Sequence, residues 1–571
     1  MKRKSPYLNR EEQAMKEVGR TEISRSCVFV ITTVFLAVIY SVPLVQTAND
    51  FLAFRSGKRA SPVPQCLDIF KRIGPAISVF AETQGSLLDR LFAANRGLLR
   101  DIHVYEETLE DESVVGRMIR PEIQYMLSRW LGAGNEKAYC GVRPWLFYRS
   151  DVDYLTAPGF LEPSQLAGRL ATGSEWRSAP QPDPRPAIVD FHRQLERRGI
   201  RLVVMPLPPK TVVHPEKFAR RFKPGPEPSQ NPSYNLFIND LENSGVTVVD
   251  PTPLLMEMRS SLGEVYLATD THWRSEAVEG VARLLARFIA DNIRLPPCPN
   301  PGYLRHEAVV TNRGDIAVML RLPDGTRAFS PEVARLRQIL GADYGFWRNE
   351  QASDVLVLGD SFCNIYSLNA MGWGESAGFV EQLSFELDRP LDRLVINDNG
   401  AYATRALLAR ELARGRDRLA GKRLVIWTFA MRELAAGDWQ SVPLVTGKPP
   451  PAKFVAPDSG RHMIVRGRVR DVAPVPRPGT VPYKDHILAL HLVDVADENG
   501  TVRDGQALVY MMSMRDNEWT LAAHMRSGES AKLRLCPWRD VERQYEGINR
   551  TELADDELQL VEPCWGELIL P

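Results

Sequence analysis

The stretch VLVLGDSFCNIYS, residues 355–367, decides how the middle of this chain folds. An uncharged apolar run stops at Gly359 and Asp360, and a serine follows at once. A short apolar run bounded by a turn signal is typical of a strand buried on both faces of a parallel sheet. Ser361 would then follow the carboxyl end of that strand, where open α/β sheets bind their ligands. It is either a nucleophile presented at the strand tip or a polar residue in a turn.

The sequence on both sides of this strand repeats the pattern. Four further apolar runs predict strands at 200–208, 246–251, 392–398 and 422–429. The stretches between them predict helices at 186–199, 232–245, 274–293 and 401–421. Strands that alternate with helices predict an α/β domain with a doubly wound parallel sheet and helices on both faces. Residues 295–352 interrupt the alternation, and we expect an irregular insertion there.

The stretch YLATDTHWRSEA, residues 266–277, supplies an acid and a base. Asp270 and His272 are two residues apart, just before a predicted long helix. A serine nucleophile needs a base within hydrogen-bond reach and an acid that fixes the tautomer of the base. A lone histidine is usually structural, and Gly-Asp-Ser tripeptides also arise by chance. The prediction of a catalytic site therefore rests on Asp270, His272 and Ser361 taken together at one sheet edge.

The composition of the whole chain excludes some classes of function. Its 571 residues are enough for about three or four domains. Lys plus Arg and Asp plus Glu number 71 each, so we predict no nucleic-acid partner. No HExxH motif and no paired His or Cys cluster occurs, so we predict neither a metal nor another cofactor.

One uncharged segment, Cys27 to Thr47, has the length and apolar character of a membrane-spanning helix. The 26 residues before it carry seven Lys and Arg. The positive-inside rule predicts a cytoplasmic N-terminus and places the rest of the chain on the far side of the inner membrane. A cleaved signal peptide is the alternative, although no clean cleavage site follows the apolar run.

The remaining organisation follows from composition. A Pro- and Gly-rich stretch separates the α/β region from a tail with short alternating segments, which predicts a small all-β barrel or sandwich. The expected parts are a cytoplasmic segment 1–26, a transmembrane anchor 27–47, a helical periplasmic segment 48–135, a catalytic domain 136–442, a linker 443–460 and a β-rich domain 461–571. Of the seven cysteines, Cys536 and Cys564 are the best candidates for a disulfide, and free buried cysteines are the alternative.

Six short motifs occur in order along the chain: WLFYRSDVDY, MPLPPKTVVHPEKF, DTHW, GDSFCNIYS, NDNGAYATR and IWTFAMREL. As a set they resemble the SGNH-hydrolase-like domain of bacterial alginate O-acetylation proteins, over roughly residues 10 to 440. The apolar segment and EEQAMKEVGRTEISRS before it resemble the membrane-anchored, periplasmic member of that group. In this family the Asp-x-His pair precedes the serine, as it does here, and the chemistry of a triad does not depend on chain order.

The resemblance implies roles for individual residues. Ser361 would be the nucleophile, His272 the general base and Asp270 its orienting partner. Arg405 would bind substrate or stabilise charge, or else be a solvated helix residue; Asn397 and Tyr402 belong to the same loop and are weaker candidates. Lys210 either lines the cleft or is an ordinary surface lysine, and WLFYRSDVDY is expected to be packing.

The function expected from this resemblance is periplasmic O-acetylation of an exopolysaccharide through an acetyl-serine intermediate. The acetyl donor would be a multi-span membrane acyltransferase, because acetyl-CoA is cytoplasmic. The acceptor polymer is alginate, cellulose or another exopolysaccharide. In one branch of the family a carbohydrate-binding module follows the catalytic domain, but the sequence of the last domain here does not identify it as one. An acetyl esterase with the same triad and a non-catalytic scaffold for polysaccharide assembly are the alternatives.

Overall fold

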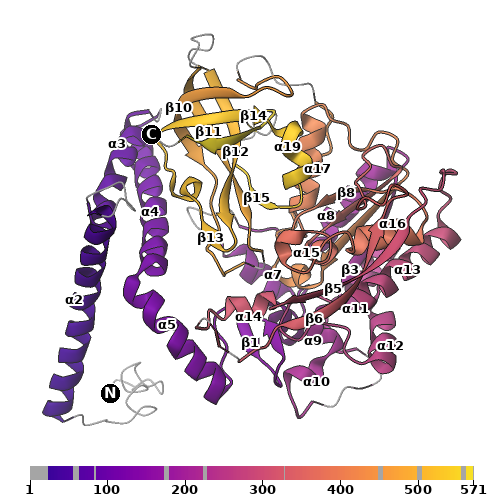
Figure 1. The fold of residues 1–571 in the computed structure, drawn as a ribbon, viewed down its shortest axis with the longest axis horizontal. Coiled ribbons are helices and arrows are strands. Elements are labelled where there is room, and N and C mark those ends of the chain that lie inside the picture. The colour runs from indigo at the N-terminus through magenta and orange to yellow at the C-terminus, as the bar shows by residue number, and fades with distance from the viewer. Residues whose placement is uncertain are drawn as a thin grey trace, which may run out of the picture. The chain divides into compact units, whose positions relative to one another are not determined.

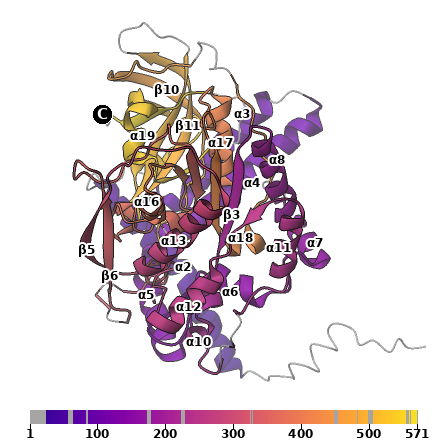
Figure 2. The same cartoon turned by 90° about the vertical axis from the view of Figure 1, so that its right-hand side faces the viewer.

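The computed structural model describes residues 24–569 with twelve gaps, at 56–62, 83–84, 173–178, 223–224, 226–227, 324, 327, 448–453, 482, 498–504, 554–557 and 559–560. The chain divides into two compact units, Met1–Arg120 and Pro121–Pro571. Almost all of the expected cytoplasmic segment 1–26, and the middle of the expected linker 443–460, lie outside the described residues. Figures 1 and 2 show the fold in two views.

The first unit contains the apolar segment as helix α2, Arg25–Arg55. By length and composition it is one candidate membrane span in the described part of the chain. The helix continues past the predicted end at Thr47 to Arg55, and apolar residues such as Phe51 and Leu52 are exposed in these last turns. Gln46 donates to Asp50 Oδ1 (3.0 Å) and to Gln65 Oε1 (3.2 Å), and all three side chains are buried.

The other elements in the described part of this unit are helical, as expected. Its elements are η1 (Gln65–Arg72), α3 (Ile73–Glu82) and α4 (Leu87–Glu112), followed by α5 (Val114–Met126) and η2 (Leu127–Leu131), which lead into the second unit. Helix α4 begins with a capping box, in which Ser86 and Asp89 each bond the other's backbone N–H. Such a box satisfies N–H groups that a helix start leaves without partners.

The second unit is built on a five-stranded sheet in the order β4-β3-β9-β7-β8, in which every pair is parallel. The strands are β3 (Arg201–Leu207), β4 (Thr247–Val248), β7 (Val355–Gly359), β8 (Asp392–Val395) and β9 (Leu424–Ala430). Four of them lie within the apolar runs that predicted them, and β9 extends one residue beyond its run of 422–429. Every residue of β7 and β9 is buried, which is why these runs are continuous rather than alternating.

Helices cover both faces of this sheet, as predicted. One hydrophobic cluster contains Val355, Val357 and Ile426 with residues of α13 (Ser275–Asn292) and α16 (Phe379–Glu386). The other contains Leu356, Leu358 and Trp427 with residues of α8 (Pro184–Glu196), α11 (Tyr234–Asn243) and α17 (Ala403–Ala413). Successive strand residues thus enter opposite cores.

One predicted helix is shorter than expected. The apolar pattern over 401–421 predicted a single long helix, but α17 ends at Ala413. Gly415 follows with φ of 82°, a left-handed conformation that glycine adopts readily and that commonly ends a helix.

The segment 295–352, predicted to be irregular, forms a hairpin instead. Strands β5 (Leu304–Asn312) and β6 (Glu332–Leu340) pair antiparallel over their whole length, with α14 (Asp315–Met319) in the connection. Figure 2 shows the two strands as a separate ribbon at the side of the domain. The residues of β5 are either exposed or half-buried, so its apolar signal is weak. Alternation in β6 (Ala334, Leu336) was the signal available.

Short elements complete the α/β part of the unit. They are β1 (Ala138–Cys140), β2 (Leu146–Tyr148), α6 (Arg149–Thr156), α7 (Pro163–Leu170), α9 (Lys210–Val213), α10 (Pro215–Phe218), α12 (Thr252–Leu262), α15 (Ser361–Asn364), η3 (Asn369–Met371) and α18 (Arg432–Ala436).

The tail forms a β-barrel-like domain, in agreement with the prediction. Five strands pair in a closed ring, β12-β16-β14-β10-β11 and back to β12, with β13 and β15 at its sides. The elements are β10 (Met463–Val472), β11 (His486–Asp497), β12 (Gly505–Arg515), β13 (Glu518–Trp519), η4 (Leu521–His524), β14 (Ser530–Pro537), α19 (Trp538–Tyr545), β15 (Asn549–Thr551) and β16 (Cys564–Leu568). It joins the α/β part through ion pairs such as Arg416–Glu562 (2.6 Å) near α17 (Figure 1).

Of the two alternatives for Cys536 and Cys564, the structure has free buried cysteines and no disulfide, because all seven cysteines are free. Cys536 lies opposite Trp565 in the β14–β16 pair, one position away from Cys564. The two thiols therefore enter different clusters, Cys564 in one core and Cys536 in the cluster that contains Trp538. Neighbouring positions on paired strands that face opposite sides of a sheet cannot be bridged without moving the backbone.

Candidate active site

Ser361 is held at the carboxyl end of β7 by a tight turn. Asp360 caps α15, and its Oδ1 accepts from the backbone N–H of Phe362 (3.0 Å). Its Oδ2 accepts from the N–H of Ala430 (2.7 Å) at the end of β9, which ties the turn to the neighbouring strand. Gly359 is needed here because a Cβ at that position would overlap the Sγ of Cys363. The turn thus presents Ser361 at the sheet edge, as the sequence predicted.

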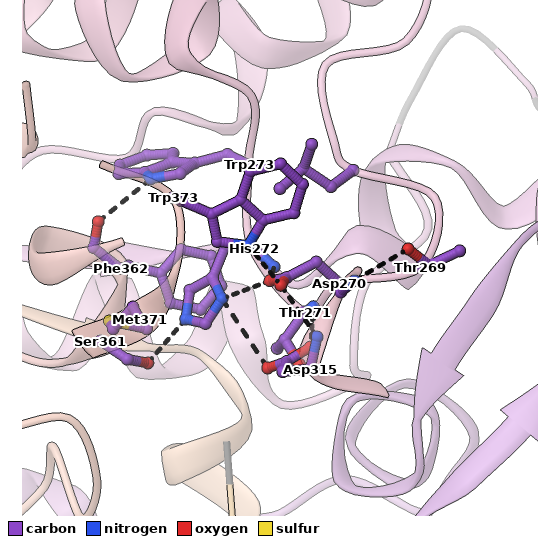
Figure 3. A network of polar contacts seen from close by, with 12 residues as sticks. Thr269, Asp270, Thr271, His272, Trp273, Asp315, Ser361, Phe362, Met371 and Trp373 are labelled. Carbon is purple, nitrogen blue, oxygen red and sulfur yellow. Dashed lines mark hydrogen bonds and ion pairs between the residues drawn. The ribbon is translucent and has the colours of Figure 1, made fainter. Parts of the chain in front are cut away.

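The loop before α13 brings His272 and Asp270 to this serine (Figure 3). His272 Nε2 lies 2.8 Å from Ser361 Oγ, and His272 Nδ1 lies 2.7 Å from Asp270 Oδ1. Because an ionised carboxylate only accepts, Nδ1 carries the proton and Nε2 is left to accept from the serine hydroxyl. Asp270, His272 and Ser361 are each at most 1% exposed. This is the geometry of a nucleophile, a base and an orienting acid.

Four N–H groups hold the carboxylate of Asp270. Oδ1 accepts from the ring and the backbone N–H of His272, and Oδ2 accepts from Trp373 Nε1 (2.9 Å) and Asp315 N (3.0 Å). Burial by itself would raise the pKa of Asp270, but these hydrogen bonds and the charge of His272 lower it to about 2. Burial would lower the pKa of His272, yet the contacts with Asp270 outweigh it and the pKa is raised.

Lys210 neither lines a cleft nor lies on the surface, so both sequence interpretations of it are wrong. It is fully buried behind the Asp-x-His loop. Its Nζ donates to the carbonyl oxygens of Leu267 (3.0 Å), Ala268 (3.2 Å) and Asp270 (2.6 Å). Burial lowers its pKa to about 8. Lys210 therefore fixes the backbone that carries the acid and the base.

Arg405 does not reach the triad, contrary to the interpretation drawn from its motif. Its guanidinium is 1% exposed, donates to the carbonyl oxygens of Ala401 and Gln440, and lies 4.8 Å from the centre of the Trp427 ring. It is not a solvated helix residue either. Because Trp427 belongs to the core that contains α8 and α17, we correct Arg405 to a packing residue.

The other two residues of that loop differ from each other. Asn397 is buried after β8, and its Oδ1 accepts from Asn364 Nδ2 (2.7 Å) on α15, the helix that begins with Ser361. Tyr402 is half-buried at the start of α17, and within the described residues its side chain bonds to no member of the triad.

Sequence reasoning missed a cation beside the helix that begins with Ser361. Arg432 follows β9, and its Nη1 lies 3.1 Å from Asp151 Oδ1. The guanidinium also lies 5.7 Å from the centre of the Phe362 ring, and it is 8% exposed. Its pKa is raised, since the charges of Asp151 and Asp360 outweigh the effect of burial. Arg432 and Asp151 both occur in motifs noted above. The position of Arg432 directly after a strand of the parallel sheet was the signal that could have identified it.

Within the described chain, Asp270, His272 and Asp315 form a group whose ligand atoms lie close enough to hold a metal ion. The chemistry of these atoms fits a proton relay better. Nδ1 of His272 faces a carboxylate, and both oxygens of Asp270 already accept from N–H groups. A cation would have to displace these donors, whereas a proton on Nδ1 completes the arrangement.

Comparisons with known proteins agree on one family. Residues 140–431, just over half of the chain, match the model described as "SGNH hydrolase-like domain, acetyltransferase AlgX". The chain is 29% identical over 175 residues to a probable alginate O-acetylase AlgJ of Pseudomonas aeruginosa, and 26% identical over 210 residues to that of Pseudomonas fluorescens. These matches cover 30% and 35% of this chain and 44% and 52% of the relatives, so the chain spans about half the length of the curated relatives it matches.

Two solved structures also align with the chain. The O-acetyltransferase domain of Pseudomonas putida AlgJ aligns with a TM-score of 0.39 at 20% identity, covering 52% of this chain and 92% of that one. Pseudomonas aeruginosa AlgX aligns with a TM-score of 0.37 at 14% identity, covering 67% of this chain and 83% of that one. The resemblance predicted from the six motifs is confirmed by the family match.

Proposed function

The chain belongs to the family of AlgX acetyltransferases with an SGNH hydrolase-like domain, and on this premise we propose that it is an O-acetyltransferase of an exopolysaccharide that works through an acetyl-serine intermediate. The observation that carries the proposal is the pair of contacts of one buried imidazole, 2.8 Å to Ser361 Oγ and 2.7 Å to Asp270 Oδ1. A serine without such a base is a weak nucleophile.

In the first half-reaction, Ser361 Oγ attacks the acetyl carbonyl of the donor while His272 Nε2 takes its proton. The negative charge that develops on the carbonyl oxygen would be stabilised by the N–H of Ser361 and by Asn397 Nδ2. Asn397 is the remaining side-chain candidate from the sequence, and its Oδ1 contact with Asn364 supports this by orienting the amide next to α15. The imidazolium then gives its proton to the leaving group, which leaves an acetyl ester on Ser361.

In the second half-reaction, a hydroxyl of the polymer attacks the acetyl-enzyme. His272 Nε2 takes the hydroxyl proton as the new ester bond forms, and returns it to Ser361 Oγ as the bond to the enzyme breaks. Throughout, Asp270 remains ionised because its pKa is lowered to about 2, so it stabilises the imidazolium. Burial of the three side chains supports transfer over hydrolysis, since a closed site excludes water from the acetyl-enzyme.

The cellular setting is part of the same proposal. Helix α2 would anchor the protein in the inner membrane with the catalytic domain in the periplasm. A multi-span membrane acyltransferase would supply the acetyl group, and the anchor would raise its effective concentration at Ser361. Alginate is the first polymer to test, because the relatives that the chain matches are called probable alginate O-acetylases.

The test uses the full-length protein in detergent with an activated acetyl ester, with and without alginate oligosaccharides. We expect an acetylated Ser361 peptide by mass spectrometry and acetylated oligosaccharide when the acceptor is present. Ser361→Ala should abolish both products, whereas Ser260→Ala, which changes an exposed serine of α12, should not. Ester hydrolysis that depends on Ser361 but gives no acetylated sugar with any exopolysaccharide offered would favour the esterase. Turnover unaffected by Ser361→Ala would refute the proposal.

A further inference from the structure

Asp315 approaches the base from a segment that the sequence did not connect with the site. It is the first residue of α14, inside the β5–β6 insertion. Its backbone N–H donates to Asp270 Oδ2 (3.0 Å), and its Oδ1 accepts from the N–H of Thr271 (2.7 Å). Its Oδ2 lies 3.9 Å from His272 Nδ1, as Figure 3 shows, and has no hydrogen-bond partner within the described chain. The side chain is 9% exposed.

The insertion is fitted closely against the loop that carries the triad. Gly314 lies so near this loop that a Cβ would overlap the carbonyl group of Thr269 and the backbone nitrogen of Asp270. Gly314 N also donates to Thr269 Oγ1 (3.3 Å), and Ala317 N donates to the carbonyl of Thr269 (3.2 Å). These contacts fix the position of Asp315 relative to His272.

We propose that Asp315 is a positioning residue that acts on His272 as a second acid, through its charge and through the N–H it gives to Asp270. This proposal rests on the proposed function, in which His272 is the general base. Asp270 accepts a hydrogen bond from the Nδ1–H of the ring. Asp315 is too far away for a hydrogen bond to Nδ1, and it therefore acts on the imidazolium electrostatically.

The charge of Asp315 changes in the pH range where such a base works. Burial and the nearby charge of Asp270 raise the pKa of Asp315 to about 7. As pH rises through this value the carboxyl ionises, and a negative charge near the ring raises the pKa of His272. The base therefore becomes stronger as Asp315 loses its proton.

Other charged and titratable groups face this pair from several elements. Lys210 lies behind the loop. Arg313 of the insertion, together with Tyr483 and Lys484 of the barrel domain, lines the pocket that reaches Asp315. Arg432 acts on His272 and lowers its pKa. None of these groups is changed by a substitution of Asp315 itself.

The experiment is a pH profile of acetyl-enzyme formation with Asp315→Asn in the full-length protein. Asparagine keeps an oxygen for Thr271 and the backbone N–H for Asp270, but it removes the charge. We expect the acid limb of the profile to move about one pH unit lower, because the pKa of His272 falls. The rate on the alkaline side should fall about 3- to 10-fold, because a weaker base remains. An acid limb in the same place would overturn the proposal.

Two further variants separate charge from structure. Asp315→Glu keeps a carboxylate and should have an acid limb closer to wild type than to Asp315→Asn; equal limbs for Glu and Asn would count against the proposal. Asp343→Asn changes an exposed aspartate of the same insertion and should leave the profile unchanged. Ser361→Ala tests the underlying function separately, since it should remove acetyl-enzyme formation whatever residue 315 is.

A measurement on the wild-type protein covers the case in which the variants do not fold. The ring signals of His272, followed by NMR in histidine-labelled protein, should shift in two steps, one of them with Asp315 near pH 7. A single step would overturn the proposal.

Discussion

His272 in the α/β part of the second unit and His486 in the barrel are both buried, and each has a ring nitrogen next to a serine hydroxyl. His272 Nε2 lies 2.8 Å from Ser361 Oγ, and His486 Nδ1 lies 2.7 Å from Ser513 Oγ. The difference is at the other ring nitrogen, which meets Asp270 in the first case and the hydroxyl of Thr551 (2.9 Å) in the second. A serine and a histidine in contact are therefore not enough to form a catalytic site. The group at the other ring nitrogen decides whether the histidine can act as a base.

The two environments move the pKa of the ring in opposite directions. Burial lowers the pKa of His486 to about 3, because no charge compensates for lost solvation. The same burial acts on His272, but the hydrogen bond and charge of Asp270 and the charge of Asp315 raise its pKa. His486 is therefore a neutral packing residue at physiological pH, whereas His272 can gain and lose a proton. The following four predictions test this contrast.

Replacing His272 and His486 by alanine should give the largest difference in the rate of acetyl-enzyme formation. We expect His272→Ala to slow acetyl-enzyme formation at least about 10⁴-fold, since the nucleophile loses its base. His486→Ala should leave the rate of the folded protein near that of wild type and lower the free energy of unfolding by about 2 kcal/mol, because Ser513 and Thr551 lose a partner. Burst kinetics and denaturant titration measure the two quantities. Equal losses of rate in both variants would break the comparison.

Removing the acid alone should make the environment of His272 resemble that of His486, which has no carboxylate partner. Asp270→Asn should slow acetyl-enzyme formation about 10³- to 10⁴-fold, because an amide does not select the tautomer with Nδ1–H or stabilise the imidazolium. Thr551→Val, the matched change at His486, should leave the rate unchanged. A rate for Asp270→Asn within tenfold of wild type would show that the carboxylate is not the deciding group.

The dependence of stability on pH should differ in sign between the two rings. The folded-state pKa of His486 is below the unfolded value of 6.5, so its contribution to stability is present above pH 6.5. It is lost as pH falls toward 3, at about 1.4 kcal/mol per pH unit. The raised pKa of His272 gives a contribution that is present below pH 6.5 and is lost as pH rises through the folded value. Unfolding of wild type and His486→Gln between pH 4 and 6.5 tests this: the variant should have the shallower slope.

Changing the serine of the barrel should have the smallest effect. Ser513→Ala removes one hydrogen bond to His486 and should lower the free energy of unfolding by about 1 kcal/mol, with the rate unchanged. Thermal unfolding beside a parallel assay of acetyl-enzyme formation is sufficient. A slower reaction would mean that the barrel histidine and the catalytic centre are coupled.

Much of the fold was readable from local pattern. Continuous apolar runs predict the buried strands of the parallel sheet, and alternating runs predict the barrel strands. The β5–β6 hairpin was missed because it is half exposed and its apolar signal is weak. Cys536 and Cys564 share a domain, but only the register of β14 and β16 shows that they face opposite sides.

The sequence predicted those residues of the candidate site that follow the ends of strands, because a parallel sheet brings these ends together at one edge. Ser361 follows that rule at the end of β7, and Arg432 follows it after β9 although it was overlooked. Asp270 and His272 lie instead on the loop between α12 and α13, and they were found through the Asp-x-His motif. Arg405 also lies in a motif that follows a strand, but the prediction that it binds substrate was wrong. A residue at the start of a helix can direct its side chain either to the site or into a core, and Arg405 packs on Trp427 in the core.

By itself the sequence determined the fold class, the family and three residues of the site, since each depends on short motifs and on strand polarity. The tertiary structure alone decided that Lys210 is a buried support for the triad loop, that Arg405 packs on Trp427, and that Asp315 reaches the imidazole. The physical reason is that these three roles depend on burial and on contacts over distances along the chain that no local pattern records. Lys210 meets a carbonyl 60 residues away, and Asp315 a carboxylate 45 residues away.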